Sequence, residues 1–352
     1  MISEDAQQHI DAYEFRSLIP SVRFGTASDR YAGWIGQIYS EEWRKGAKKR
    51  KRTLGGKKYD EQTVAVGSTA EYFEHFSTLE VDFTFYRALV DADNLPTNNY
   101  FVLQRYADAA PPDAQFVLKA PQQISARLLR RSGPNGLRYE DNPTLLDPEL
   151  FLQSFVRPAE LILGSRLIGI ILEQEYQRKG SSVSNEENIV AFDHFFSVLP
   201  DIPQVHIELR SPHLLTPEYF AWLRHAGVGH VFSHWTWLPS IADQWNRSDQ
   251  QSSAANKDLV CRLLTPRKMP YAKAYELAHP FDRVVKELSE TPQAAAMIDE
   301  TAGMAIESLN KGITPIIISN NRAWGNAPSL AQKVATRILE EMGDREVDKA
   351  PF

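Results

Sequence analysis

The sequence of 352 residues is very poor in cysteine. Its one cysteine, Cys261, excludes an internal disulfide and a metal site made of cysteines alone, and it fits a reducing compartment. No apolar run approaches the length that spans a bilayer. The N-terminal residues 1–15 are acidic and polar, so they do not form a signal peptide. We therefore expect a soluble, cytoplasmic protein with no membrane partner.

Several motifs of well-known enzyme classes are also missing. The sequence has no G-x-G-x-x-G after its first predicted strand, no Walker loop for phosphate and no nucleophile elbow. These absences argue against a dinucleotide-binding open sheet. No cofactor is predicted. A divalent ion on Glu80, Asp82, Glu208 and His234 stays open as an alternative, although nearby Lys and Arg oppose a cation.

The chain has no excess of positive charge overall, since its net charge is −6. Residues 44–58 depart from this balance with nine Lys or Arg and no acid, around a Gly55-Gly56 pair. The simplest interpretation is a solvated surface loop, and the alternative is an arm that binds nucleic acid or another anion. With 43% hydrophobic and 24% charged residues, the rest of the chain has enough apolar side chains for a full core.

The segment Gln204–His213 is the most informative stretch that is present. Val205, Ile207 and Leu209 alternate with polar residues, so the pattern predicts a strand with one apolar face. In a barrel, such a strand would pack its apolar face under helices and turn its other face inward. Glu208 and Arg210 would then lie at the carboxyl end, where barrel enzymes hold their catalytic groups.

Seven further segments have the pattern of strands, and helical patterns or long loops separate them. The predicted strands are 22–28, 78–85, 115–120, 167–174, 205–210, 227–235, 259–264 and 314–320. The predicted helices are 68–76, 98–109, 149–163, 189–199, 217–225, 281–310 and 329–342. This alternation indicates parallel strands joined by crossovers. Eight such units favour an α/β fold with a single (β/α)8 TIM-type barrel over an open doubly wound sheet.

The domain organisation follows from these segments. We expect an N-terminal extension over residues 1–20, the TIM-type barrel over 21–343 and a C-terminal tail over 344–352. The basic segment 44–58 is expected as a loop inserted after the first strand. Polar segments at 128–147, 181–188 and 240–258 are expected as further loops.

Several segments resemble a known family in the order in which that family has them. They are Phe24-Gly25-Thr26-Ala27, the run Glu80–Arg87, Lys119-Ala120-Pro121, Ile207-Glu208-Leu209-Arg210 and Ser319-Asn320-Asn321. On these motifs the chain resembles the YecE-like family, which is domain-of-unknown-function family seventy-two, over about residues 22–336. The resemblance implies a TIM-type barrel. It implies no reaction, because the role of that family is not established.

Polar residues gather at the predicted carboxyl ends of seven strands. By alternation, the inward set is Glu80, Asp82, Lys119, Gln174, Glu208, Arg210, His234, Arg262 and Asn320. Burying so many charged groups is costly unless they pair with each other or meet a ligand. A self-satisfied network of ion pairs is therefore the alternative to an active site.

The residue types indicate the chemistry of such a site. Glu80 and Glu208 are predicted as a general acid and base pair, with Lys119 as a third catalytic group. Lys119, Arg210 and Arg262 together indicate an anionic ligand. The remaining ligand-binding candidates are three amides, two aromatic rings and one imidazole: Gln174, Asn320, Asn321, Tyr86, Trp34 and His234.

The segment 320–327 precedes the last predicted helix and has two interpretations. Its backbone N–H groups could hold a phosphate, as the loops after the last strands of such barrels often do. The alternative is an ordinary loop in which Asn326 caps the helix.

These features favour an enzyme, of hydrolase or lyase type, acting on a small anionic molecule that is phosphorylated or contains a sugar. Two alternatives remain. One is a protein that binds or cleaves nucleic acid through residues 44–58, and the other is a barrel that binds a ligand without turnover.

Overall fold

The computed structural model describes residues 2–133, 136–180, 183–202 and 204–348. The strands are β1 Arg23–Ala27, β2 Lys48–Leu54, β3 Lys57–Thr63, β4 Thr78–Val81, β5 Gln115–Lys119, β6 Leu128–Gly133, β7 Gly136–Asp141, β8 Leu167–Gln174, β9 Val205–Leu209, β10 Gly229–His234, β11 Asp258–Leu263 and β12 Thr314–Ser319. The α-helices are α1 Glu4–Asp11, α2 Thr69–His75, α3 Asn98–Ala109, α4 Gln122–Ser125, α5 Pro148–Phe151, α6 Arg157–Leu163, α7 Asn185–Ser197, α8 Pro217–Ala226, α9 Ile241–Arg247, α10 Tyr271–Ala278, α11 Lys286–Ser289, α12 Pro292–Asn310, α13 Asn321–Trp324 and α14 Ala327–Asp348.

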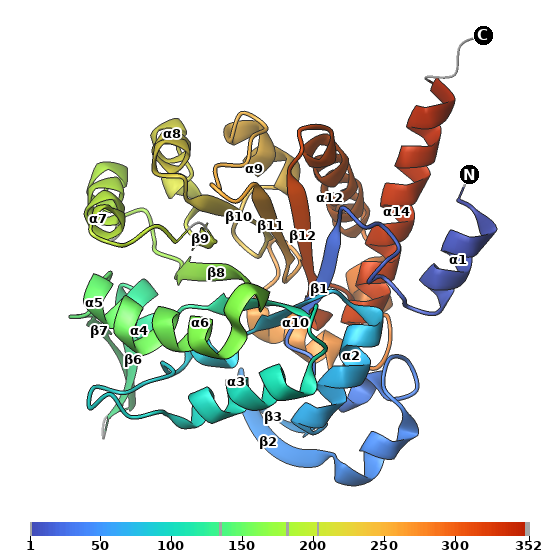
Figure 1. Cartoon of the computed structure of the whole chain (residues 1–352), viewed down its shortest axis with the longest axis horizontal. Coiled ribbons are helices and arrows are strands. Elements are labelled where there is room, and N and C mark those ends of the chain that lie inside the picture. Colours follow the sequence, from blue (N-terminus) through green and yellow to red (C-terminus); the bar gives the residue numbers. More distant parts are fainter. Residues whose placement is uncertain (1, 134–135, 181–182, 203, 349–352) are drawn as a thin grey trace.

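Eight of the strands form one closed parallel barrel, which confirms the predicted fold class. Their order is β1-β12-β11-β10-β9-β8-β5-β4, and β4 pairs again with β1 to close the ring. Each predicted barrel strand therefore exists, and neighbours in the chain are neighbours in the barrel. Figure 1 shows the helices arranged around the strands. All eight carboxyl ends lie at the same end of the barrel, because the pairs are all parallel.

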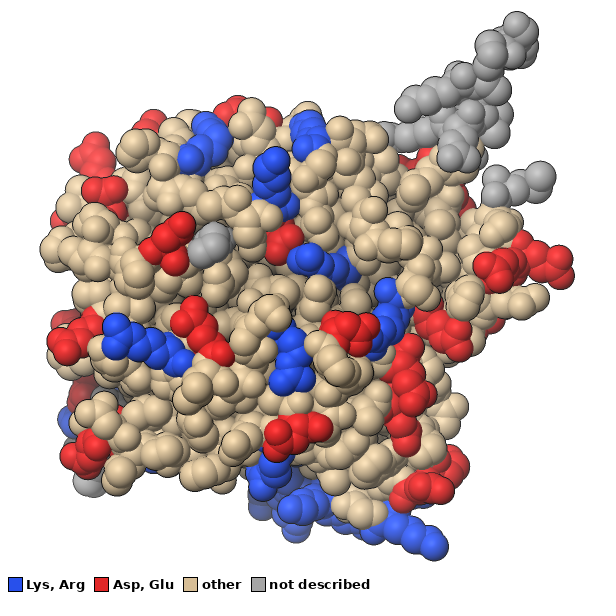
Figure 2. All heavy atoms as spheres, viewed as in Figure 1, with Lys and Arg blue, Asp and Glu red and all other residues tan. Residues whose placement is uncertain are grey.

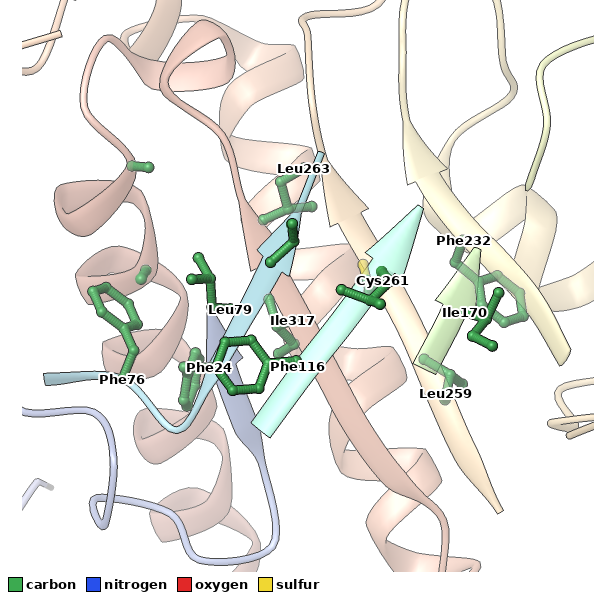
Figure 3. Packing of buried hydrophobic residues seen from close by; sticks show 14 of the residues in the cluster. Phe24, Phe76, Leu79, Phe116, Ile170, Phe232, Leu259, Cys261, Leu263 and Ile317 are labelled. Atoms are coloured by element: carbon green, nitrogen blue, oxygen red, sulfur yellow. The ribbon is translucent and has the colours of Figure 1, made fainter. Parts of the chain in front are cut away.

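The outer face of the barrel carries the larger part of the core. Figure 3 shows Phe24, Leu79, Phe116, Phe232 and Ile317, each from a different strand, packed in one hydrophobic cluster. Val205, Ile207 and Leu209 of β9 belong to the same cluster, which confirms the predicted apolar face. Cys261 lies there too as a free, buried thiol, and burial raises its pKa to about 12.

The inner face is filled by smaller, branched side chains below the mouth. Val117, Ile171, Val231 and Val260 form part of this second cluster, with Ile316 and Ile318 from β12. A barrel interior packed in this way is a core and not a pore.

His206 also points into the barrel, below Glu208 on β9. A Cβ at Gly229, its partner in the neighbouring strand, would lie 1.9 Å from Nδ1 of this ring, so glycine is needed there. Among the described residues, neither ring nitrogen of His206 has a hydrogen-bond partner. Burial lowers the pKa of His206 to about 4, so the ring is neutral at pH 7.

Three segments predicted as loops contain regular structure. Residues 44–58 contribute to an antiparallel hairpin of β2 and β3, whose turn residues Gly55 and Gly56 both have positive φ, as a tight hairpin turn requires. Residues 128–133 and 136–141 form a second antiparallel pair of strands, β6 and β7. Residues 240–258 contain α9, capped by Ser240. The hairpins escaped prediction because their residues are polar on both faces, so apolar alternation is absent.

Two boundaries also differ from prediction. The strand predicted over 78–85 ends at Val81, and a 3-10 turn, Phe83–Phe85, follows, because Oγ1 of Thr84 donates to the carbonyl of Lys119 at 2.6 Å. The helix predicted from residue 189 starts at Asn185, where Ser184 and Glu187 form a capping box. Residues 181–182 of the predicted loop lie outside the described residues.

The two ends of the described chain pack together. In the extension, α1 lies beside α14, and Nε2 of Gln332 donates to the carbonyl of Ile10 at 3.0 Å (Figure 1). The helix predicted over 281–310 is divided into α11 and α12, since α12 begins at Pro292 with Thr291 as its cap. None of the helices in the described part of the chain has the length and apolar character required to cross a bilayer.

Candidate active site at the barrel mouth

Six charged side chains meet at the carboxyl ends of five strands. They are Glu80 of β4, Lys119 of β5, Glu173 of β8, Glu208 and Arg210 at the end of β9, and Arg262 of β11. They come from distant parts of the chain, and five of the six are almost completely buried. Parallel closure of the barrel brings them together, because the carboxyl ends of all its strands lie at the same end.

Three of these side chains form an inner tier, which we define as Glu80, Glu208 and Arg262. Arg262 donates from Nε to Oε2 of Glu80 at 2.7 Å and from Nη2 to Oε1 at 2.6 Å, so this pair is bidentate. Its Nη1 donates to Oε2 of Glu208, and the other oxygen of Glu208 accepts from Oγ of Ser233 at 2.6 Å. All four carboxylate oxygens of the inner tier are therefore occupied by protein donors.

The other three side chains form an outer tier, which we define as Glu173, Lys119 and Arg210. Lys119 Nζ lies 2.6 Å and Arg210 Nη2 lies 2.7 Å from the same oxygen, Oε2 of Glu173. Arg262 Nη1 lies 3.6 Å from this oxygen and links the two tiers. Oε1 of Glu173 has no hydrogen-bond partner among the described residues, and this atom is not completely buried. It is the one carboxylate oxygen of the two tiers that a ligand can still use.

Charge is distributed unevenly between the tiers. The inner tier has two carboxylates and one guanidinium, and the outer tier has one carboxylate and two cations. Burial raises the pKa of Glu80, against the opposing effect of Arg262. Burial acts in the same direction on Glu173, but Arg210, Lys119 and Arg262 together hold its pKa well below the usual range. The outer tier thus has a surplus of positive charge toward the mouth.

Aromatic rings flank the two cations of the outer tier. Lys119 Nζ lies 4.0 Å from the centre of the Phe85 ring, and Arg210 Cζ lies 5.0 Å from that of Trp235. Such cation–π contacts help to hold each cation in place. Arg210 is the most exposed of the six side chains, at 18%.

Glu173 and Ser233 are the site residues that the sequence prediction missed. Alternation had placed Gln174 and His234 on the inward face. Strand pairing sets Glu173 opposite Glu208, so Gln174 lies on the other face with Leu209. Likewise Ser233 points inward to Glu208, and His234 does not. Ile171, two positions before Glu173, lies on the inner face of β8, so alternation counted from Ile171 would have placed Glu173 inward.

The Asn-Asn segment and Trp34 have contacts that account for them structurally. Trp34 is fully buried, and its Nε1 donates to Oδ1 of Asn321 at 3.2 Å. Asn320 caps α13, and Asn326 caps α14 by accepting from Ser329 N at 2.9 Å. Ala327 N is also used, by Oδ1 of Asn321. The capping interpretation is therefore the one that the contacts support, and these N–H groups are not open to a phosphate.

Tyr86 and Asp82 lie at the mouth but outside both tiers. Tyr86 follows the 3-10 turn, is 68% exposed and packs edge-on against Phe85. Asp82 lines a separate cavity of about 490 Å³ together with Arg30 and Arg52. The predicted inward position of Asp82 is wrong, because β4 has already ended at Val81.

The basic segment forms a surface distinct from the mouth. Lys48, Lys49, Arg50 and Lys51 of β2 are exposed, and Figure 2 shows Lys and Arg gathered along the lower edge, where Figure 1 draws the β2–β3 hairpin. Arg52 instead turns toward the body of the protein and donates to Oε1 of Glu61 at 3.1 Å and to the Tyr271 hydroxyl at 3.1 Å. The hairpin is thus attached to the barrel by one face and solvated on the other.

The carboxylates at the mouth are not grouped as metal ligands. Over residues 2–133, 136–180, 183–202 and 204–348, no three His, Cys, Asp or Glu side chains are grouped so that they could hold a metal ion. The carboxylates at the mouth are paired with Lys and Arg, which repel a cation.

Comparison with known proteins places the chain in a family. A family model described as "Protein of unknown function DUF72" matches residues 23–351. The chain belongs to this family. No curated protein matches it.

Solved structures of DUF72 family proteins have the same fold. One from Thermotoga maritima MSB8 superimposes with a TM-score of 0.54 at 15% identity, covering 91% of this chain and 99% of the other. One from Enterococcus faecalis V583 gives a TM-score of 0.52 at 15% identity, with 90% and 95% covered. At this identity the likeness concerns the fold alone, so function has to be argued from the mouth itself.

Proposed function

We propose that the barrel mouth binds a small anionic molecule between Lys119 and Arg210, and that Glu173 acts on it as a general base in a hydrolase- or lyase-type reaction. The observation that carries this proposal is the asymmetry of Glu173. Both cations contact its Oε2, and its Oε1 has no protein partner among the described residues. A base must have an oxygen within hydrogen-bond reach of the proton it removes.

The surplus of positive charge in the outer tier supports an anionic ligand. Arg210 and Lys119 share a single carboxylate oxygen, so each has N–H donors left for a second anion. A phosphate or carboxylate placed between them would form charge-assisted hydrogen bonds in a low-dielectric site. Such a group is the one that these two cations accept with the least rearrangement.

Ligand binding would also adjust the strength of the base. In the unliganded site the cations keep the pKa of Glu173 low, which makes its carboxylate a weak base. An anion that draws Arg210 and Lys119 toward itself weakens this effect, while burial continues to raise the pKa. The pKa of Glu173 then moves toward neutrality, where a general base is most effective. Water, or a C–H bond next to the anionic group, is the proton source that Glu173 would deprotonate.

The inner tier has a supporting role in this proposal. Glu80 and Glu208 were the predicted acid and base pair, but both are completely buried and all their oxygens are bonded to Arg262 or Ser233. We assign them to positioning Arg262, which in turn lies 3.6 Å from Oε2 of Glu173. Lys119 keeps its predicted place at the chemistry, as a cation that stabilises developing negative charge.

The experiment is calorimetric titration of the full chain with inorganic phosphate, followed by a screen of phosphoester, glycoside and lactone substrates. We expect Arg210→Gln to weaken phosphate binding by about tenfold, equivalent to about 1.4 kcal/mol. The matched control is Arg337→Gln, since Arg337 pairs with Asp299 on the surface. Equal phosphate affinity in both variants would reject the proposed anion site.

The screen tests the base separately from the anion site. For any substrate that the wild-type protein turns over, we expect Glu173→Gln to lower kcat by at least about a hundredfold. Full activity of Glu173→Gln would remove this residue from the mechanism even if anion binding is confirmed.

A further inference from the structure

A second cavity lies beside the mouth and is not part of either tier. Its volume is about 820 Å³, and Arg127, Asp141, Tyr176, Gln177 and Trp237 are among the residues that line it. Residues of β6 and β7 line it from one hairpin, and residues of the segment after β8 also line it. The walls are tied together because both oxygens of Glu175 accept backbone N–H bonds, at 3.0 Å from Arg127 and 2.9 Å from Leu128. Cavities of this size hold small molecules.

A row of aromatic rings connects this cavity with the outer tier. Arg210 lies over the ring of Trp235, whose centre is 6.4 Å from that of Tyr176, and Tyr176 is 6.1 Å from Trp237. Tyr176 is 42% exposed and Trp237 49%, so both present ring surface to the solvent. The row therefore begins at a cation of the anion site and ends in the second cavity.

Gln177 supplies the polar counterpart in the cavity wall. Its residue is 9% exposed, and its side-chain Nε2 is buried without a hydrogen-bond partner among the described residues. Its backbone N–H donates to Oγ of Ser211 at 2.9 Å, which fixes the residue in place. A buried donor without a partner is energetically unfavourable, and a ligand oxygen would satisfy it. Asn142, on the opposite wall, differs because its amide already donates to the carbonyls of Gln123 and Ala126.

We propose that this cavity binds a sugar ring of the same ligand whose anionic group lies at Lys119 and Arg210, so that the substrate is a sugar phosphate or a sugar acid. This inference rests on the proposed function and adds the substrate class to it. A sugar presents C–H faces, which pack on aromatic rings, and hydroxyl oxygens, which accept from an amide such as Gln177.

The arrangement of the rings favours a sugar over a nucleobase. Tyr176 is tilted by 46° to Trp235 and by 39° to Trp237, so it forms a parallel slot with neither of these rings. A planar base stacks best between parallel faces, whereas a puckered ring packs against a bent surface. A nucleotide is therefore the competing ligand in the test.

The test compares four probes on the full chain by calorimetry: inorganic phosphate, methyl glucoside, glucose 6-phosphate and adenosine monophosphate. We expect glucose 6-phosphate to bind at least about tenfold more tightly than phosphate. Trp237→Ala should remove this gain and leave the affinity for phosphate unchanged, while Trp237→Phe should keep most of the gain. Leu161→Ala, at a position 79% exposed on α6, is the control for loss of an exposed apolar side chain.

The outcomes separate this inference from the proposed function. If phosphate binds and depends on Arg210, but glucose 6-phosphate gains nothing from Trp237, the sugar site is wrong and the anion site stands. If adenosine monophosphate gains more than the sugar phosphate through Trp237, the cavity is a base-binding site and the sugar assignment is overturned. If phosphate binds equally well to Arg210→Gln and to wild type, the anion site is wrong.

Discussion

The two tiers at the barrel mouth contain the same kinds of side chain but differ in how completely they are satisfied. In the inner tier, every oxygen of Glu80 and Glu208 accepts a hydrogen bond and the three side chains are 0–3% exposed. In the outer tier, one oxygen of Glu173 is left over and Arg210 is 18% exposed. Two contacts of 3.6 Å join the tiers, one between Arg262 and Glu173 and one between Arg210 and Glu208.

This difference shows how a network of ion pairs and a binding site can share one barrel. Buried ion pairs contribute little net stability compared with apolar packing, because desolvation offsets their attraction. The inner tier is therefore best understood as a support that fixes Arg262 and, through it, the position of Glu173. The outer tier keeps the unused donors and the unused acceptor that chemistry requires.

The largest expected effect is on the inner tier. Arg262→Met removes the one cation that Glu80 and Glu208 share, and two buried carboxylates are left without it. We expect a loss of about 3–5 kcal/mol in the free energy of unfolding, measured by urea denaturation. The control is Arg337→Met on the surface, where about 0–1 kcal/mol is expected. Similar losses in the two variants would mean that the inner tier does not have the stabilising role assigned to it.

Acid should lower the stability of the protein through His206 in the barrel interior and not through Glu173 at the mouth. The unfolded chain protonates its histidines near pH 6.5, but burial lowers the pKa of His206 to about 4 in the folded protein. The unfolded state then binds more protons between pH 6.5 and 4, so stability falls as pH falls through this window. From pH 7 to pH 5, His206 alone should account for about 2 kcal/mol.

This pH dependence is measured by urea unfolding at the two pH values. His206→Met should make the loss between pH 7 and 5 smaller than in wild type, although His230, with a pKa of about 3, and His234, with a pKa of about 4, retain their share. Glu173 stays ionised throughout, because its pKa is lowered. An unchanged pH dependence in His206→Met would contradict the burial of this ring.

A smaller effect on stability is expected after β12, where backbone N–H groups donate to capping side chains. Asn326→Ala removes the acceptor for Ser329 N at the start of α14, and we expect about 1 kcal/mol lower stability by thermal unfolding. Phosphate affinity should not change, because this segment is not assigned to the ligand. A loss of phosphate binding without a loss of stability would restore the phosphate interpretation of residues 320–327.

The smallest effect is expected on the basic hairpin. Lys49→Gln with Lys51→Gln changes two exposed side chains of β2, so stability should stay within about 0.5 kcal/mol. Phosphate binding at the mouth should also be unchanged. Binding of DNA or RNA that is lost in this variant and weakens steeply with salt would instead support the nucleic-acid alternative.

The barrel was predictable because its strands are strongly patterned. β8 matches its predicted range, residues 167–174, and α3 its predicted range, residues 98–109. Apolar alternation and helical periodicity suffice where one face of an element is buried. The β2–β3 hairpin has no such pattern, since its charged strands owe their order to pairing with each other and to contacts such as Arg52 with Tyr271.

The site was predictable as a set of strands but not residue by residue. Glu80, Lys119, Glu208, Arg210 and Arg262 were predicted at the mouth, and the structure brings all five together. Glu173 was missed because which of two adjacent polar residues points inward depends on strand register, and a shift of one residue reverses the face. In β8–β9 that register is set by pairing across the barrel, which the local sequence does not contain.

The most direct test of the difference between the tiers is the affinity of Glu173→Gln for inorganic phosphate, measured by calorimetry beside Glu80→Gln. Removing the charge of Glu173 frees Lys119 and Arg210 from their carboxylate, so we expect phosphate to bind about tenfold more tightly than to wild type. Glu80→Gln should give no such gain, because its partner is Arg262 of the inner tier. Unchanged or weaker phosphate binding to Glu173→Gln would contradict the account of an outer tier that is open to anions.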